Sequence, residues 1–274
     1  MARENGLEIG IAHNPSPNAL IKYVSGMHTP KIDANDRLIV ALDLPDIARS
    51  REMVRQLETI VSFYKIGLAL QLAPGVDSFI PELMNAGNRV FLDYKYYDVP
   101  ETLKKAVSRA AQVGVTFLTV HGSRDLLRGA VEGRGDTGLK LFTVTVLTSM
   151  DAADIAEMGY THTTVEELVL FRARKALEAG CDGVIASGHE ARKIKEVTRN
   201  HLLVVAPGIR DEESPQDDQK RRMSARDAIL AGADYLVIGR PITGAPSPSS
   251  AAERLLRDMQ AAFQERESLM TATS

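Results

Sequence analysis

The sequence has very little of several features that would each point to a particular class of protein. It contains one cysteine, Cys181, among 274 residues, so no intramolecular disulfide can form and a reducing cytoplasm is expected. Its apolar runs, such as residues 38–42 and 202–206, are far shorter than the roughly 20 residues of a membrane helix. The N-terminus lacks the apolar core of a secretory signal. These absences predict a cytoplasmic protein without a membrane span.

The charge distribution also lacks a block of one sign. The chain has 33 Lys and Arg and 36 Asp and Glu residues, and both signs are interspersed along most of its length. Nucleic-acid-binding proteins usually present a basic patch or stripe, so no nucleic-acid partner is expected. The remaining composition, with 44% hydrophobic and 25% charged residues, is typical of an ordinary globular protein.

From residue 37 onward, short β-branched runs alternate with amphipathic stretches of helical period, which is typical of repeated βα units. Four glycines follow helical stretches just before a strand, where a left-handed residue ends a helix: Gly87, Gly114, Gly180 and Gly232. Eight strands are predicted, at residues 37–43, 63–68, 89–95, 117–122, 140–148, 183–187, 202–208 and 235–240. Eight such units predict an α/β protein with a closed (β/α)8 TIM barrel.

A doubly wound open sheet is the structural alternative, because it also alternates strands and helices. The first predicted strand is not followed by a G-x-G-x-x-G turn, since Asp43-Leu44-Pro45-Asp46 stands there, and this favours the barrel. We expect a single barrel domain at residues 35–268, an N-terminal extension at residues 1–34 and a C-terminal tail at residues 269–274.

Three charged residues, Asp93, Lys95 and Asp98, stand at the end of the third predicted strand. Strand alternation puts Phe91, Asp93 and Lys95 on one face, so both charges point into the barrel if Phe91 does. A structural salt bridge is one interpretation of this pair. Burying charges is costly, however, and catalytic groups of barrels lie at the carboxyl ends of strands, which favours a functional site.

The D-x-K-x-x-D motif of these three residues resembles the signature of the orotidine 5′-monophosphate decarboxylases and of a wider superfamily with the same barrel. The chain also contains the other residues of that pattern in the expected order, two before the motif and five after it: Asp43, Lys65, Thr148, Arg210, Gln219, Gly239 and Arg240. The resemblance covers residues 37–240. It implies a metal-free and cofactor-free lyase that converts orotidine 5′-monophosphate to uridine 5′-monophosphate in de novo pyrimidine biosynthesis.

The resemblance also implies catalytic roles. Lys95 would stabilise the charge that develops at C6 of the pyrimidine and then donate a proton there. Asp93 would lie near the departing carboxylate, where it either raises the ground-state energy or holds Lys95 in place, and both readings stay open. Lys65 and Asp98 would complete an alternating array with them, and Asp43 and Lys65 would bind ribose hydroxyls.

The remaining residues of the pattern would bind substrate. Thr148 would contact the pyrimidine, and Arg210, Gly239 and Arg240 would hold the phosphate. Gln219 would reach the phosphate from the polar stretch at residues 211–222. An ion pair of Arg210 with a nearby acidic residue is an alternative reading of that arginine.

The resemblance implies a homodimer in which Asp98 and Thr102 reach into the partner's site. A Mg²⁺-dependent sugar-phosphate decarboxylase or aldolase of the same superfamily is a competing function. Such enzymes hold the metal with a carboxylate near the end of strand two, where this chain has Lys65, and an ammonium group cannot coordinate Mg²⁺. An inactive nucleotide-binding barrel is a third possibility, but it would be expected to lose Lys95 or one of its aspartates.

Overall fold

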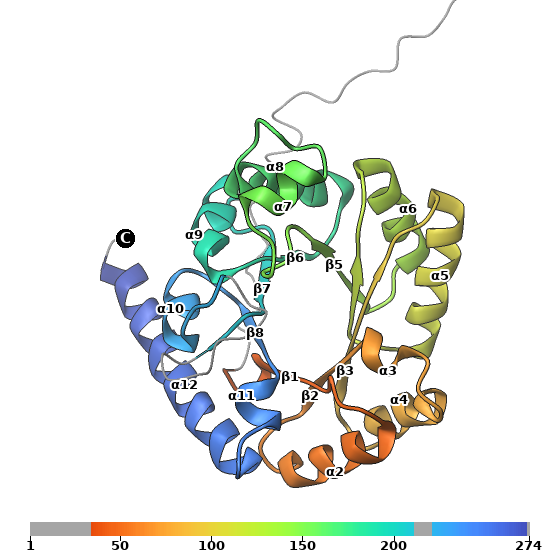
Figure 1. Ribbon diagram of the computed structural model, residues 1–274, viewed down its shortest axis with the longest axis vertical. Coiled ribbons are helices and arrows are strands. Elements are labelled where there is room, and N and C mark those ends of the chain that lie inside the picture. Colours follow the sequence, from red (N-terminus) through yellow and green to blue (C-terminus); the bar gives the residue numbers. More distant parts are fainter. Residues whose placement is uncertain (1–33, 211–220, 273–274) are drawn as a thin grey trace, which may run out of the picture. The chain divides into compact units, whose positions relative to one another are not determined.

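The computed structural model describes residues 34–210 and 221–272. The chain divides into two units, residues 1–32 and 33–274, and every described residue belongs to the second. This unit contains eight parallel strands that close into a barrel in sequence order, each strand paired with the next and β8 paired with β1. Helices surround the strands (Figure 1). The predicted (β/α)8 barrel is confirmed.

All eight predicted strands are present at the expected places. They are β1 (Leu38–Ala41), β2 (Phe63–Gly67), β3 (Arg89–Tyr96), β4 (Phe117–Val120), β5 (Lys140–Val144), β6 (Gly183–Ile185), β7 (Leu203–Ala206) and β8 (Tyr235–Ile238). Most are shorter than predicted, because the predicted ranges extend into the residues that follow the observed end of each strand. β5 differs most, since it ends at Val144 rather than at residue 148.

The helices alternate with the strands along the chain. They are η1 (Ala34–Asp36), α2 (Ile47–Leu57), α3 (Leu68–Gln71), α4 (Val76–Asn85), α5 (Pro100–Val113), α6 (Arg124–Arg134), α7 (Ala152–Glu157), α8 (Val165–Ala179), α9 (Gly188–Val197), α10 (Ala225–Leu230), α11 (Arg240–Thr243) and α12 (Pro248–Ala272). Gly114 and Gly180 end α5 and α8 with φ values of 87° and 88°, as the sequence predicts. α12 continues four residues into the predicted C-terminal tail.

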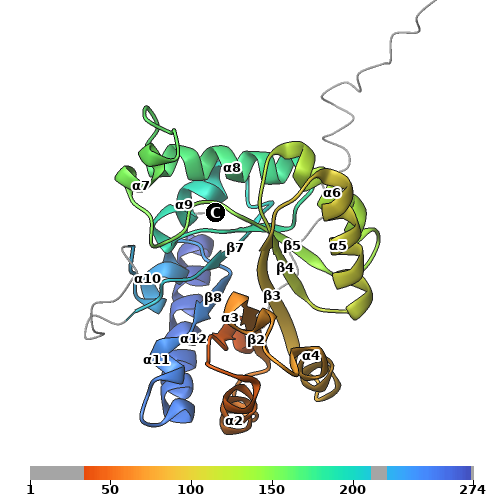
Figure 2. The same ribbon diagram turned by 45° about the vertical axis from the view of Figure 1, so that its right-hand side comes forward.

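The last helix closes the ring of helices. α12 contacts α10 and α11 on one side and α2 on the other, so the end of the barrel domain lies beside its beginning (Figure 2). None of the helices in residues 34–210 and 221–272 combines the length and the apolar character that crossing a bilayer requires.

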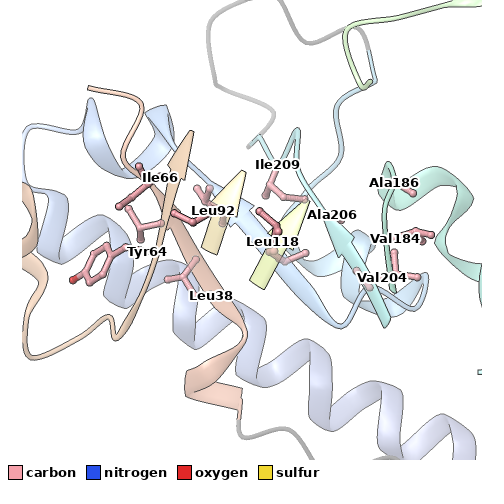
Figure 3. Packing of buried hydrophobic residues seen from close by; sticks show 14 of the residues in the cluster. Leu38, Tyr64, Ile66, Leu92, Leu118, Val184, Ala186, Val204, Ala206 and Ile209 are labelled. Carbon is pink, nitrogen blue, oxygen red and sulfur yellow. The ribbon is translucent and has the colours of Figure 1, made fainter. Parts of the chain in front are cut away.

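Side chains on the outer faces of the strands form the main core beneath the helices. Tyr64 and Ile66 of β2 and Leu118 of β4 are fully buried there, next to residues of β1, β3, β6 and β7 (Figure 3). Alternation along each strand then sends the intervening side chains into the barrel. The outer core therefore determines which residues of each strand face inward.

Aromatic rings fill the inside of the barrel near the amino ends of the strands. The ring of Phe117 lies 4.9 Å from that of Phe63, 4.5 Å from that of Phe142 and 5.1 Å from that of Tyr235, measured between centroids. The contacts with Phe63 and Tyr235 are edge-to-face and the contact with Phe142 is tilted, and edge-to-face pairs stabilise beyond the burial of apolar area. Two residues after Phe63 on the same face of β2 stands Lys65, so the charged side chains begin where the aromatic layer ends.

Candidate active site

A cavity of about 600 Å³ opens at the carboxyl ends of the strands. Its volume lies within the range of small-molecule sites. The charged and polar side chains that line it are Asp43, Lys65, Asp93, Lys95, Thr148, Ser149, Arg210, Arg240 and Thr243. Strand alternation predicted that Phe91, Asp93 and Lys95 share an inward face, and all three line this cavity.

Asp93 is the centre of the charged cluster. Its Oδ1 accepts a hydrogen bond from Lys95 Nζ at 2.9 Å, and its Oδ2 lies 3.3 Å from Lys65 Nζ. Lys65 also donates to Asp43, at 3.0 Å to Oδ1 and 3.2 Å to Oδ2. The structure therefore brings together four of the predicted residues as a continuous chain of alternating charge, in the order Asp43, Lys65, Asp93, Lys95.

The charges of the cluster stabilise one another. Burial works against a charge on Lys65, but the attraction of Asp93 and Asp43 outweighs it and raises the pKa of Lys65 above its usual value. Burial likewise opposes the charge on Asp93, and the two lysines together outweigh it and lower the pKa of Asp93. The side chain of Lys65 is only 8% exposed, so solvent screens these interactions little.

Thr119 of β4 is a member of the cluster that was not predicted from the sequence. Its Oγ1 donates to Asp93 Oδ1 at 3.0 Å and accepts from the backbone N–H of Lys95 at 2.9 Å. Thr119 is fully buried. Its only local signal is a hydroxyl on the inward face of a strand, and β-branched residues are common in strands for packing reasons alone.

Lys95 has an unusual backbone conformation. Its φ is 50°, in the left-handed region that non-glycine residues seldom adopt, and the register of β3 against β4 shifts between Leu92 and Tyr96. Conformations of this kind cost about 1–3 kcal/mol and are concentrated at functional sites. With this backbone conformation, Lys95 Nζ pairs with the same carboxylate as Lys65 Nζ.

Gly67, at the end of β2, leaves the space that the cluster needs. A Cβ atom at this position would lie 2.7 Å from Asp43 Oδ1 and 2.9 Å from Lys65 Nζ, both too short for non-bonded contacts. The φ of Gly67 is −99°, which any residue can adopt, so the requirement for glycine is one of space. Gly67 was not predicted from the sequence as part of the site.

The predicted substrate-binding residues after β5, β7 and β8 face the same cavity. Thr148 and Arg210 are almost fully buried, at 7% and 8% exposure, while Arg240 is exposed at the first residue of α11. Gly239 precedes α11 as its N-cap. Since β3 and β7 are four strands apart in the closed ring, Arg210 lies across the cavity from Lys95. Gln219 lies outside the described residues.

Asp98 and Thr102 are not part of the cluster within one chain. Asp98 lies in the loop between β3 and α5, as expected, and its carboxylate accepts from the backbone N–H of Val99 at 2.7 Å. Both side chains are exposed, and neither lines the cavity. Among the described residues, no three His, Cys, Asp or Glu side chains gather in an arrangement that could hold a metal ion.

The fold and the site define a barrel enzyme with a lysine–aspartate cluster and two arginines around one cavity. The profile of the Orotidine 5'-phosphate decarboxylase / HUMPS family matches residues 36–255. The chain belongs to this family.

Relatives with high identity support the assignment. A protein named orotidine 5'-phosphate decarboxylase from Nitrobacter winogradskyi is 50% identical over 236 residues, which are 86% of this chain and 97% of the relative. A protein of the same name from Rhodopseudomonas palustris is 44% identical over 83% of this chain and 96% of its own length. A crystal structure of orotidine 5'-phosphate decarboxylase from Lactobacillus acidophilus is similar with a TM-score of 0.71 and 33% identity, covering 82% of this chain and 99% of the other.

Proposed function

We propose that this chain catalyses the decarboxylation of orotidine 5′-monophosphate to uridine 5′-monophosphate in de novo pyrimidine biosynthesis. The observation that carries the proposal is the chain of alternating charges in the cavity, with Asp93 shared between Lys65 and Lys95. Proteins of that name that are 44–50% identical over most of this chain support the same activity. The enzyme would act in the cytoplasm, where its buried cysteine stays reduced.

The chemistry requires stabilisation of a carbanion. Breaking the bond between C6 and the carboxylate releases CO2 and leaves an electron pair on C6 that the pyrimidine ring delocalises poorly. In this proposal the Lys95 ammonium group stabilises that charge at short range and then donates a proton from Nζ to C6. Solvent returns the proton to Lys95 after the product leaves.

Two roles for Asp93 were open from the sequence, and its contacts favour positioning of Lys95. The same Oδ1 accepts from Lys95 Nζ and from Thr119 Oγ1, and Thr119 also accepts from the Lys95 backbone. These bonds fix Lys95 at both its backbone and its ammonium group before substrate binds. Such preorganisation means that little rearrangement is needed when charge develops in the transition state.

The substrate would extend across the cavity from the cluster to the arginines. Asp43 and Lys65 would bind the ribose hydroxyls, and Thr148 would contact the pyrimidine. Arg210, Gly239 and Arg240 would bind the phosphate. Gln219 would be a further phosphate ligand. Guanidinium groups suit this role because they offer paired donors to phosphate oxygens. The two halves of the cavity would then bind the two ends of one nucleotide, and binding energy from the phosphate can contribute to catalysis at the base.

We also propose that the enzyme is a homodimer in which Asp98 and Thr102 complete the partner's cluster. Both residues are exposed in the single chain and are close in sequence to the catalytic lysine. Sedimentation should give twice the chain mass. Mixing an inactive Lys95→Ala chain with an inactive Asp98→Ala chain should restore part of the activity, because one site of the mixed dimer would be intact; a fully active monomer would contradict the proposal.

The direct test is the change in ultraviolet absorbance as orotidine 5′-monophosphate loses its carboxylate, followed with and without a strong chelator. The proposal expects the same rate in both. Absence of any change would defeat the assigned reaction. A rate that is lost with chelator and restored by Mg²⁺ would instead favour the Mg²⁺-dependent alternative.

A further inference from the structure

A second ion pair, between Glu190 and Arg221, lies beside the cavity. Glu190 is in the first turn of α9, and Arg221 is the first residue described after the 211–220 segment. Arg221 Nη1 donates to Glu190 Oε1 at 2.5 Å, and the two side chains are only 13% and 7% exposed. Neither residue is among the described residues that line the cavity.

Arg221 contacts three consecutive carbonyl groups of the segment after β5. Its Nη2 donates to the carbonyls of Val146 at 2.9 Å and Leu147 at 3.1 Å. Its backbone N–H donates to the carbonyl of Thr148 at 3.1 Å. All three contacted residues line the cavity, so Arg221 fixes the path of the segment that presents Thr148.

The residues that follow Arg221 also contact the segment after β7 and the start of α9. The backbone N–H of Arg210 donates to the carbonyl of Met223 at 3.0 Å. The His189 ring nitrogen Nε2 lies within hydrogen-bond distance of the Arg222 carbonyl, at 3.1 Å. This short stretch therefore connects the Thr148 segment, α9 and Arg210.

The Glu190–Arg221 pair is poorly suited to be a stabilising feature. Within residues 34–210 and 221–272, Glu190 Oε2 and Arg221 Nε are buried without a hydrogen-bond partner. Burial raises the pKa of Glu190 even though Arg221 attracts its charge. Buried ion pairs can often be replaced by apolar residues without loss of stability. What this pair contributes is an orientation, because Glu190 directs the planar guanidinium group so that Nη2 faces the carbonyls after β5.

We propose that Glu190 and Arg221 are positioning residues that keep the segment containing Thr148 and the segment containing Arg210, which follows β7, at the separation needed to bind base and phosphate together. The inference rests on the proposed function, in which Thr148 contacts the pyrimidine and Arg210 the phosphate. A shift of about 1 Å in such a segment can cost on the order of 10²-fold in rate even when the changed residue is remote from the chemistry.

The chain provides a matched control on the same helix. Lys195, near the end of α9, donates to Asp234 Oδ2 at 2.5 Å, and these side chains are 15% and 11% exposed. Asp234 stands just before β8, at the opposite end of the barrel from the cavity. The two ion pairs are similar in side-chain burial and in the distance between their charged atoms, but they lie at opposite ends of the barrel.

The test compares Glu190→Gln and Arg221→Lys with Asp234→Asn. Both changes at the cavity end should lower kcat/KM for orotidine 5′-monophosphate by about 10- to 100-fold, mostly through KM, in addition to the loss of stability expected for any buried pair that loses one partner. Asp234→Asn should lower the melting temperature and leave kcat and KM unchanged. Lysine keeps the charge of Arg221 but lacks the forked donors, so it tests geometry rather than charge.

Amide hydrogen exchange provides a readout that does not require activity. The Arg221 N–H donates to Thr148, so Glu190→Gln should speed its exchange while amides of β1 and β2 stay protected. Unchanged KM and unchanged exchange in both cavity-end variants would overturn the inference, as would a loss of stability without a change in KM. A wild-type chain that does not convert the substrate would instead overturn the proposed function, and the exchange measurement would still decide the positioning role.

Discussion

At the amino end of the barrel, two aspartates use their charge to join neighbouring elements. Asp234 Oδ2 accepts from Lys195 and, at 2.7 Å, from the backbone N–H of Val204. Asp182 Oδ2 accepts from Arg134 at 2.6 Å and from the backbone N–H of Leu141 at 2.9 Å. Each aspartate stands directly before one strand and contacts the preceding one, so each ties a strand pair to a cation on a helix.

At the carboxyl end, the shared carboxylate of Asp93 faces an open cavity instead. It binds two ammonium groups, and one of them belongs to a residue with a left-handed backbone. The same chemical groups therefore serve two purposes. Ion pairs at the amino end stabilise the barrel, whereas those at the carboxyl end hold charges ready for a ligand, in line with the location of active sites in barrel enzymes.

The largest expected difference between the two ends concerns Lys95. Lys95→Ala should lower kcat by at least about 10⁴-fold, equivalent to about 5 kcal/mol or more, because the proton donor and the charge next to C6 are both removed. The barrel should remain folded, since the side chain is 31% exposed and Asp93 would keep Lys65 as a charged partner. Absorbance assays and thermal unfolding measure the two effects, and near-normal turnover would refute the assigned role.

The opposite result is expected for Asp182. Asp182→Asn should lower the free energy of unfolding by about 3 kcal/mol, because Arg134 would lose its charged partner while partly buried. The values of kcat and KM should stay within about twofold of the wild type. Denaturant unfolding and steady-state kinetics give both quantities. A large loss of activity in a folded variant would break the distinction between the two ends.

A change at Thr119 tests whether activity depends on the hydrogen bonds that position Lys95. Thr119→Val keeps the shape of the side chain but removes its hydrogen bonds with Asp93 and with the Lys95 backbone, and kcat should fall roughly tenfold, or about 1.4 kcal/mol. Thr143 of β5 is the matched control, because it is also buried and its hydroxyl donates to the Cys181 sulfur, at 3.4 Å, rather than to the charged cluster. Thr143→Val should leave kcat unchanged, and equal effects of the two changes would contradict the positioning of Lys95.

The fold could be predicted from the sequence because its signals are local. Alternating apolar patterns and helix-ending glycines identified all eight strands and their order. The ends of the strands could not be predicted so well, since pairing depends on the neighbouring strand. Residues 145–148 continue the apolar pattern of β5 but lie beyond its last paired residue, and three of them line the cavity.

The site was predictable where a motif carries it and unpredictable where distant segments meet. Thr119 is 26 residues from Asp93, and the unusual φ of Lys95 occurs where the register between two strands shifts. Neither feature can therefore be recognised from a local sequence pattern. The aspartates of the amino end had a signal that was overlooked. Ala-Gly-x-Asp precedes both β6 and β8, ending in Asp182 and Asp234.

The smallest expected effect is on the pH dependence of stability. The lowered pKa of Asp93 stabilises the fold above the unfolded value of about 3.9, and this contribution is lost as the pH falls through the folded pKa. The raised pKa of Lys65 acts at the alkaline side. Its contribution to the stability of the fold is complete below the unfolded pKa of about 10.4 and is lost as the pH rises through the folded pKa. Both shifts depend on Asp93, so Asp93→Asn should flatten both flanks of a plot of melting temperature against pH. Flanks that keep their wild-type slopes would show that the cluster, unlike the pairs at the amino end, contributes nothing to the stability of the barrel.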